Sequence, residues 1–220
     1  AVLKEVNIRL PRGTILGLMG ENGAGKSTLM KCLFGMYTKD TGTIRLDGKT
    51  VDFKSSREAL QSGVAMVHQE LNQCLNRTIQ DNLFLGRYIT NCGVINEKVM
   101  YKKSLELFHR LNFTFNPKTP IRNLSVSQRQ MVEIAKAVSY NAKVIVLDEP
   151  TSSLSEKETV KLFSIIRDLK KKGVSFVFIS HKMNEIFELC DNIVVLRDGD
   201  VTLDKPIPET NLDEVVQAMV

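Results

Sequence analysis

Cysteine is scarce in the 220-residue sequence, and its four cysteines are far apart. Cys32, Cys74, Cys92 and Cys190 form no C-x-x-C pair, which argues against a disulfide scaffold and against a zinc site. The reducing cytosol is therefore the simplest environment for this chain.

Long apolar runs are also missing, because no stretch approaches the roughly 20 residues needed to cross a bilayer. Any membrane role that the sequence predicts is therefore peripheral. Tryptophan is absent, aromatic residues make up 6% of the sequence, and the positive residues behind the net charge of +5 are scattered. This composition gives little reason to expect a nucleic acid partner. Apolar residues are plentiful at 43%, which is enough to form a core.

The order of apolar segments predicts an α/β fold. Residues 143–147 and 174–179 are apolar, β-branched runs of the kind found in parallel sheets covered on both faces. Residues 156–172 between them have helical periodicity, so strand, helix and strand alternate. Nearer the N-terminus we expect paired strands at 2–10 and 14–19, a helix at 26–34, a hairpin arm at 43–46, a capped helix at 55–62 and a buried strand at 64–67.

The middle of the chain has a different, mostly helical character. Helical patterns occupy 97–111, behind a possible Asn96 cap, and the stretch from Ser125 to Ser139. We therefore expect an α/β core interrupted by a helical insertion at about 85–140. Because the chain begins Ala-Val-Leu without a methionine, we also expect it to be trimmed at its N-terminus.

A glycine-rich loop carries the strongest chemical signal. GENGAGKS at 20–27 matches G-x-x-x-x-G-K-[ST] and lies between a predicted strand and a predicted helix, as a phosphate-binding loop requires. Glycines let backbone N–H groups converge on phosphate oxygens, and the helix N-terminus favours negative charge. Lys26 is expected to contact the phosphates and the Ser27 hydroxyl to hold Mg²⁺. The expected nucleotide-binding residues are Asn22, Gly23, Ala24, Gly25, Lys26, Ser27 and Thr28.

Two carboxylates follow the apolar run at 144–147. Open α/β sheets bind ligands at the carboxyl ends of their strands, which is where Asp148 and Glu149 fall. Asp148 is expected to reach Mg²⁺, and Glu149 to orient or deprotonate an attacking water. Gln69 and His181 also follow predicted strands at this edge, where Gln69 could contact metal or water and His181 a γ-phosphate. We assign a structural role to the other two histidines, His68 and His109.

A second polar cluster opens the helix that follows residue 124. Ser125 is well suited to cap this helix, but a cap does not explain why Ser127, Gln128 and Gln130 crowd the same turn. We interpret the cluster as a second anion cradle. Because one phosphate chain cannot easily fill two cradles, we expect Ser125, Ser127 and Gln128 to contact a nucleotide held by another domain.

In this order, these motifs closely resemble the nucleotide-binding domains of ABC transporters over essentially the whole chain. The motifs are the phosphate loop, Gln69, LSVSQ at 124–128, the acidic strand end at 144–149, SSLS at 152–155 and His181. The resemblance implies a P-loop NTPase core with an antiparallel β-subdomain and an inserted helical subdomain. It also implies head-to-tail pairing of two domains around two ATP molecules, with the signature segment (124–128) completing the partner's site.

Several positions depart from the family pattern. The signature usually is LSGGQ, whereas Val126 and Ser127 occupy the glycine positions here. Valine cannot bring the backbone as close as glycine, and the Ser127 hydroxyl could compensate. Ser155 stands where the family usually has aspartate. The aromatic residue that stacks on adenine would lie upstream of Ala1, with Val2 as a possible support for the base.

Within the family, the amino-acid sequences of several segments are similar to those of ATPases of bacterial monosaccharide importers, particularly the galactose/methyl-galactoside type. The segments are 66–72, 85–87, 131–136, 179–183 and 195–199. The resemblance implies ATP hydrolysis that drives sugar import at the cytoplasmic face of the inner membrane. The implied partners are a second nucleotide-binding domain in the C-terminal half of a longer chain, membrane permease subunits contacted by about 69–85, and indirectly a periplasmic sugar-binding protein.

Two other functional classes fit the sequence less well. A soluble ABC ATPase that acts on DNA is disfavoured because the stretch between Gln69 and Ser125 is too short for a long coiled coil, and ribosomal members remain the stronger alternative. A regulatory domain that does not hydrolyse ATP is disfavoured because Lys26, Asp148 and Glu149 are all present.

Overall fold

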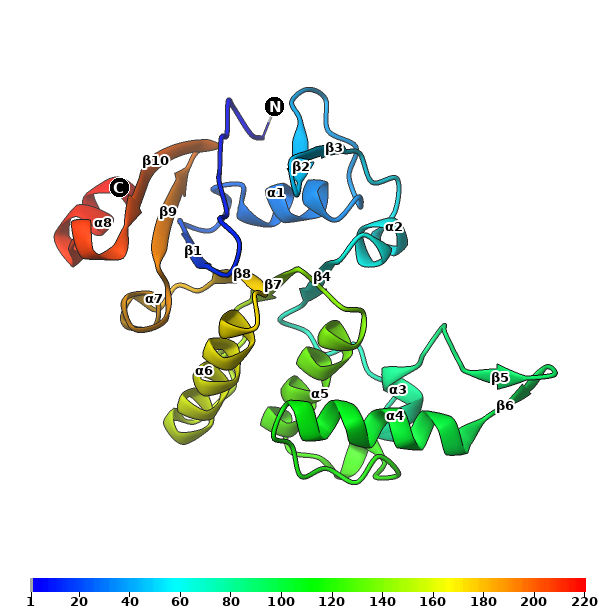
Figure 1. Ribbon diagram of the computed structural model, residues 1–220. Coiled ribbons are helices and arrows are strands. Elements are labelled where there is room, and N and C mark those ends of the chain that lie inside the picture. The colour runs from blue at the N-terminus through cyan, green and yellow to red at the C-terminus, as the bar shows by residue number, and fades with distance from the viewer. Residues whose placement is uncertain (1) are drawn as a thin grey trace.

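The centre of the molecule is a six-stranded sheet in the order β10-β9-β1-β8-β7-β4 (Figure 1). A computed structural model describes residues 2–220. Strands β1, β4, β7, β8 and β9 run parallel to one another, and β10 is antiparallel to β9. Their bounds are β1 Ile15–Met19, β4 Val64–Val67, β7 Val144–Asp148, β8 Ser175–Ile179, β9 Asn192–Arg197 and β10 Asp200–Pro206. The strands predicted at 14–19, 64–67, 143–147 and 174–179 are therefore confirmed.

Both faces of this sheet are buried, as the apolar runs predict. Alternate residues of β1 belong to different cores, since Ile15 and Met19 face the larger cluster while Leu16 and Leu18 face the smaller one. Figure 1 shows α1 on one side of the sheet and α6 on the other. The helices around the core are α1 Lys26–Leu33, α2 Ser56–Gln61, α6 Glu156–Lys171, α7 Met183–Leu189 and α8 Leu212–Met219.

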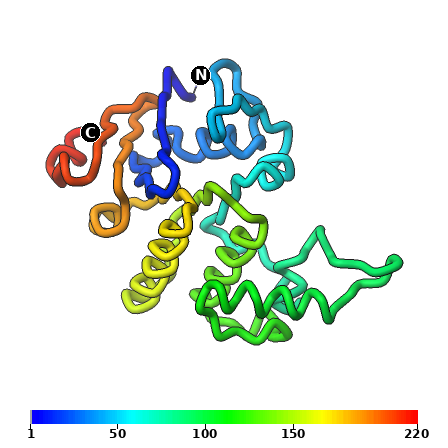
Figure 2. Tube along the Cα trace, in the orientation of Figure 1, coloured from blue at the N-terminus to red at the C-terminus, as the bar shows by residue number. Residues whose placement is uncertain are grey.

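The segment between β4 and β7 is mostly helical. It contains α3 Ile79–Leu83, α4 Glu97–Arg110 and α5 Val126–Ser139, with a short 3₁₀ turn at Ile121–Asn123. Side chains cap α4 and α5 as expected, with Asn96 and Ser125 accepting hydrogen bonds from backbone N–H groups of the first turn. Figure 2 shows this green part of the trace gathered in a lobe on the opposite side from both chain ends. The sequence did not predict the small hairpin of β5 Thr90–Asn91 and β6 Val94–Ile95 that projects from this lobe.

The strand predicted at 2–10 is wrong, because residues 2–10 form no strand. Val6, Ile8 and Leu10 are partly buried against the smaller core cluster, so the alternating pattern reflects packing rather than a ladder. The backbone is tied to the rest of the chain by a hydrogen bond of 2.8 Å from Lys4 N to Gly199 O. In the described residues the expected antiparallel subdomain is therefore represented by the hairpin of β2 Ile44–Leu46 and β3 Lys49–Val51.

None of the helices described between residues 2 and 220 combines the length and apolarity needed to cross a membrane.

Candidate functional site

The glycine-rich loop joins β1 to α1 and depends on close backbone approach. Gly20 has φ 146°, and a Cβ there would lie 2.2 Å from Leu196 O. Gly25 precedes α1 with φ 107°, and among the described residues no side chain caps this helix. The first N–H groups of α1 are thus left for an anion. The Lys26 ammonium lies inside the loop, donating hydrogen bonds to Gly20 O at 2.7 Å and to Glu21 O at 3.0 Å.

Residues that follow three neighbouring strands meet at Glu149. Its Oε1 lies 3.1 Å from His181 Nδ1, and its Oε2 accepts a 3.3 Å hydrogen bond from Gln69 Nε2. Glu149 has φ 45°, an uncommon value for a residue with a side chain. A hydrogen bond of 3.0 Å from Glu149 N to Ile179 O holds this backbone against the end of β8. The structure thus brings together residues 69, 149 and 181, which are far apart in the sequence.

Burial and neighbouring charges shift the pKa values of Asp148 and Lys26 at this edge. Burial, and then the nearby carboxylate of Glu149, raise the pKa of Asp148 above its usual range. Burial lowers the pKa of Lys26, although Glu149 and Asp148 act in the opposite direction. In both groups the loss of hydration outweighs the attraction between opposite charges. Such a site, with two carboxylates and a partly dehydrated ammonium, favours a ligand that carries both phosphate and a cation.

The polar side chains at the start of α5 bond mainly to one another. The Ser125 hydroxyl accepts a hydrogen bond from Gln128 N at 3.2 Å, and Gln128 Oε1 accepts one from Ser125 N at 2.9 Å. Ser127 is 6% exposed and its hydroxyl lies 2.8 Å from that of Ser125. Hydrogen bonds from Ser127 and from Ser155 lower the pKa of Glu158. These signature residues therefore form a compact capped turn on the helical lobe and are not part of the cluster around Glu149.

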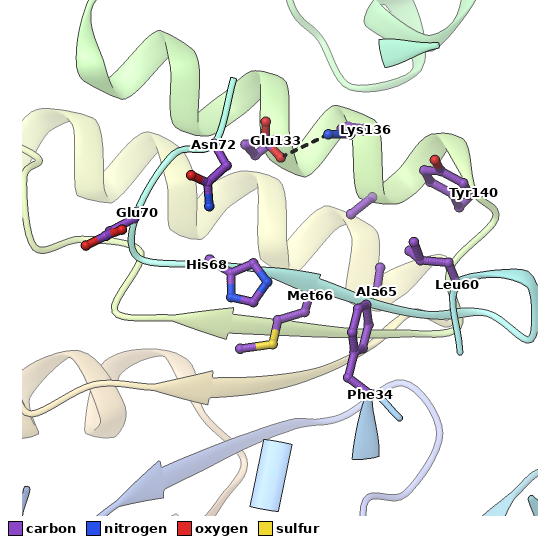
Figure 3. Close-up of a pocket in the computed structure, with 11 residues that line it drawn as sticks. Phe34, Leu60, Ala65, Met66, His68, Glu70, Asn72, Glu133, Lys136 and Tyr140 are labelled. Atoms are coloured by element: carbon purple, nitrogen blue, oxygen red, sulfur yellow. Dashed lines mark ion pairs between the residues drawn. The ribbon is translucent and has the colours of Figure 1, made fainter. Parts of the chain in front are cut away.

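A cavity of about 190 Å³ lies beside the site, between the end of β4 and α5. Figure 3 shows that Glu133 and Lys136 line this cavity from α5, while His68 and Asn72 line it from the segment that follows β4. Within residues 2–220, the buried Glu133 Oε1 has no hydrogen-bond partner. Sequence reasoning missed this cavity, because it arises from packing between the helical lobe and the sheet rather than from a local motif.

A phosphate loop between a strand and a helix, with an acidic strand end beside it on a parallel sheet, defines the P-loop NTPase class of fold. Residues 3–152 match the family model described as "ABC transporter". The chain belongs to the ABC transporter family, which confirms the family and fold class predicted from the sequence.

Comparisons with known proteins agree. The chain is 64% identical over 219 residues to the galactose/methyl galactoside import ATP-binding protein MglA of Treponema denticola. This match covers 100% of the present chain and 44% of the Treponema protein. The chain therefore spans less than half the length of the curated relative. A nucleotide-free ATP-binding cassette from an ABC transporter superimposes with a TM-score of 0.87 at 24% identity, covering 100% of this chain and 92% of that one. A dimeric cassette in a post-hydrolysis state with ADP and Pi gives a TM-score of 0.78 at 24% identity over 94% and 90% of the two chains.

Proposed function

We propose that this chain is the ATP-hydrolysing part of an importer of a monosaccharide of the galactose/methyl galactoside type. The observation that carries the proposal is the convergence of Gln69 and His181 on Glu149, at the same sheet edge as Lys26. The printed name of the Treponema relative supports the sugar class, and its identity of 64% spans the whole chain.

Nucleotide binding is assigned to the loop. Backbone N–H groups of 22–28 and the Lys26 ammonium would hold the phosphates of ATP, because that ammonium is close to the loop backbone. The Asp148 carboxylate, the Ser27 hydroxyl and the Gln69 amide oxygen are hard oxygen ligands that fit Mg²⁺. Residues 2–220 contain no group of three or more His, Cys, Asp or Glu that could hold a metal ion. Bound Mg²⁺ would neutralise charge on the phosphates and on Asp148.

Hydrolysis is assigned to Glu149, with Gln69 and His181 as its neighbours. Glu149 would orient or deprotonate the attacking water, and His181 would contact the γ-phosphate. The His181 side chain is 64% exposed and that of Glu149 is 25% exposed, so the histidine remains accessible to a ligand. Loss of the γ-phosphate would remove this contact and release the closed state.

The remaining parts of the proposal concern partners. The signature residues Ser125, Ser127 and Gln128 would meet the γ-phosphate held by a second nucleotide-binding domain, consistent with the dimeric cassette to which this chain is similar in fold. The cavity beside Gln69 would receive a permease segment at the cytoplasmic face of the inner membrane. A periplasmic sugar-binding protein would act through that permease. The whole of 1–220 would form one domain with the helical lobe inserted at about 85–140.

The test uses the full-length chain assembled with its permease in lipid vesicles. Sugar-dependent ATP hydrolysis is expected, and Glu149→Gln should reduce turnover by about 10²- to 10⁴-fold, the typical contribution of a general base. This variant should still bind ATP and sediment as the closed form when ATP is present. Undiminished hydrolysis by Glu149→Gln would refute its assignment, and co-purification with ribosomes instead of a permease would refute the import function.

A further inference from the structure

Glu185 of α7 is a buried carboxylate that accepts two hydrogen bonds and forms one ion pair. Glu185 is 9% exposed to solvent. Oε2 accepts hydrogen bonds from Thr151 Oγ1 at 2.7 Å and from Ser180 Oγ at 3.1 Å. Oε1 lies 3.1 Å from Lys182 Nζ. Glutamate is rarely buried to this degree unless its charge is paired and hydrogen-bonded, as it is here.

The two hydroxyls have no access to water as an alternative acceptor. Thr151 is 1% exposed and Ser180 is 4% exposed. Both therefore depend on Glu185, because a buried donor without a partner is costly. The carboxylate thus fixes the orientation of two side chains from different loops.

These loops are the ones that carry the proposed catalytic groups. Thr151 lies two positions after Glu149, while Ser180 and Lys182 flank His181. Lys182 Nζ also lies 3.4 Å from Thr151 O, so the two loops are joined a second time. The uncommon backbone conformation of Glu149, with φ 45°, persists only if its surroundings hold it.

We propose that Glu185 is a positioning residue that holds Glu149 and His181 at their mutual distance, acting through Thr151, Ser180 and Lys182. It touches neither the nucleotide nor the attacking water. The inference rests on the proposed function, because it assigns to Glu185 the placement of the groups that perform hydrolysis. A displacement of about 1 Å in such a group can reduce turnover by about 100-fold, so the expected effect is on kcat.

The first experiment changes the hydroxyl donor in the full-length chain assembled with its permease. Thr151→Val keeps the shape of the side chain and removes the bond to Glu185, whereas Thr151→Ser keeps the hydroxyl. We expect kcat for ATP to fall by about 10- to 100-fold in Thr151→Val, with KM changed by less than about twofold, and to recover in Thr151→Ser. Glu185→Gln, which alters the acceptor at nearly constant volume, should lower kcat in the same way.

The matched control is Ser104→Ala. Ser104 is also fully buried, and its hydroxyl donates to Met100 O at 2.9 Å within α4, on the helical lobe. This variant should lose a buried hydrogen bond without a change in kcat. Equal losses of kcat in Ser104→Ala and Thr151→Val would overturn the inference, because they would show a general effect of lost stability.

The second experiment combines Thr151→Val with Glu149→Gln. If Glu185 acts through Glu149, the residual turnover of Glu149→Gln should not fall further in the double variant. A full additional loss would overturn the positioning role. If Glu149→Gln alone turned over like the wild type, the proposed function of Glu149 would fail, and the inference with it. A normal kcat in Thr151→Val, together with an inactive Glu149→Gln, would overturn the inference alone.

Discussion

Two polar clusters of this chain differ in what their side chains face. At the carboxyl edge of the sheet, Gln69 and His181 follow separate strands and lie against Glu149, and burial together with the Glu149 carboxylate raises the pKa of Asp148. At the start of α5, Ser125 and Gln128 satisfy one another in a capping box. The first cluster is assembled by tertiary structure, whereas the second is a local turn that the helix completes by itself.

The difference indicates how each cluster could serve catalysis. The sheet edge has an ammonium, carboxylates and free helix N–H groups within one chain, so phosphate binding there requires no second surface. Among the described residues the capped turn offers no comparable set of charges, and we propose that it meets an anion presented by another domain. Nucleotide affinity should therefore depend on the sheet edge, and turnover should depend on both clusters.

The largest expected effect comes from Lys26→Met. Removal of the ammonium eliminates charge-assisted hydrogen bonds to phosphate, and we expect ATP affinity to fall by about 100-fold, as measured by equilibrium binding to the full-length chain. Lys31→Met is the matched control, because it removes the same charge from α1, where the ammonium lies 3.4 Å from the Tyr37 hydroxyl. Equal losses in both variants would mean that net charge, and not the loop, determines affinity.

A smaller effect tests how the loop is built. Gly20→Ala should lower the free energy of unfolding by about 2 kcal/mol more than Gly23→Ala, as measured by denaturant unfolding. Both glycines have positive φ, at 146° and 91°. A Cβ at Gly20 would meet backbone at 2.2 Å, whereas no atom of residues 2–220 lies within 4 Å of a Cβ at Gly23. Comparison of the two variants thus separates the cost of a steric clash with Leu196 O from the cost of a side chain at positive φ. Similar costs in both variants would contradict the close approach to Leu196 O.

Local signals made much of this molecule predictable. The Asn96 and Ser125 caps begin the two long helices of the lobe where the sequence places them, because a capping side chain needs only its own first turn. The strand at 143–147 was predictable for a similar reason, since both faces of a central parallel strand are apolar. Lys26 could be assigned because the phosphate loop is continuous in sequence.

The predictions failed where packing partners are distant in sequence or where short exposed strands carry no pattern. Residues 2–10 alternate like a strand, yet their alternation serves packing of Val6 and Ile8 on the core. The β5–β6 hairpin turns at Cys92 and Gly93, which both have positive φ, but its two-residue strands are exposed and carry no apolar alternation. The role of Glu185 could not be predicted from the sequence, because its hydrogen-bond partners Thr151 and Ser180 follow two different strands, β7 and β8.

The capped turn gives the third test. Ser125→Ala and Asn96→Ala each remove the N-cap of a 14-residue helix in the same lobe, so both should lower the free energy of unfolding by about 1 kcal/mol. Only Ser125→Ala should also reduce ATP turnover, with ATP affinity unchanged, because only this cap is proposed to meet a nucleotide across the domain pair. Steady-state ATPase assays beside binding measurements distinguish the two. If Asn96→Ala reduced turnover equally, the turn at Ser125 would have no special role.

The smallest effect concerns stability at the sheet edge. Burial and Glu149 raise the pKa of Asp148 above its usual 3.8, so the folded state holds this proton more tightly than the unfolded state does. The stability gained from the proton is fully present below pH 3.8 and is lost as pH rises through the raised pKa. Asp148→Asn should therefore raise the melting temperature at pH 8, without nucleotide or Mg²⁺, by less than about 4 °C, and by less as the pH falls toward 3.8.

The control for this shift is Asp204→Asn, which changes an exposed aspartate of β10 and should leave the melting temperature unchanged. Addition of ATP and Mg²⁺ should reverse the order, because the wild type gains binding energy that the asparagine variant lacks. An Asp148→Asn protein that melted at or below the wild-type temperature at pH 8 would show that this carboxylate stabilises the free protein. The sheet edge would then resemble the capped turn of α5, in which polar groups stabilise the fold, and the raised pKa of Asp148 would not support ligand binding there.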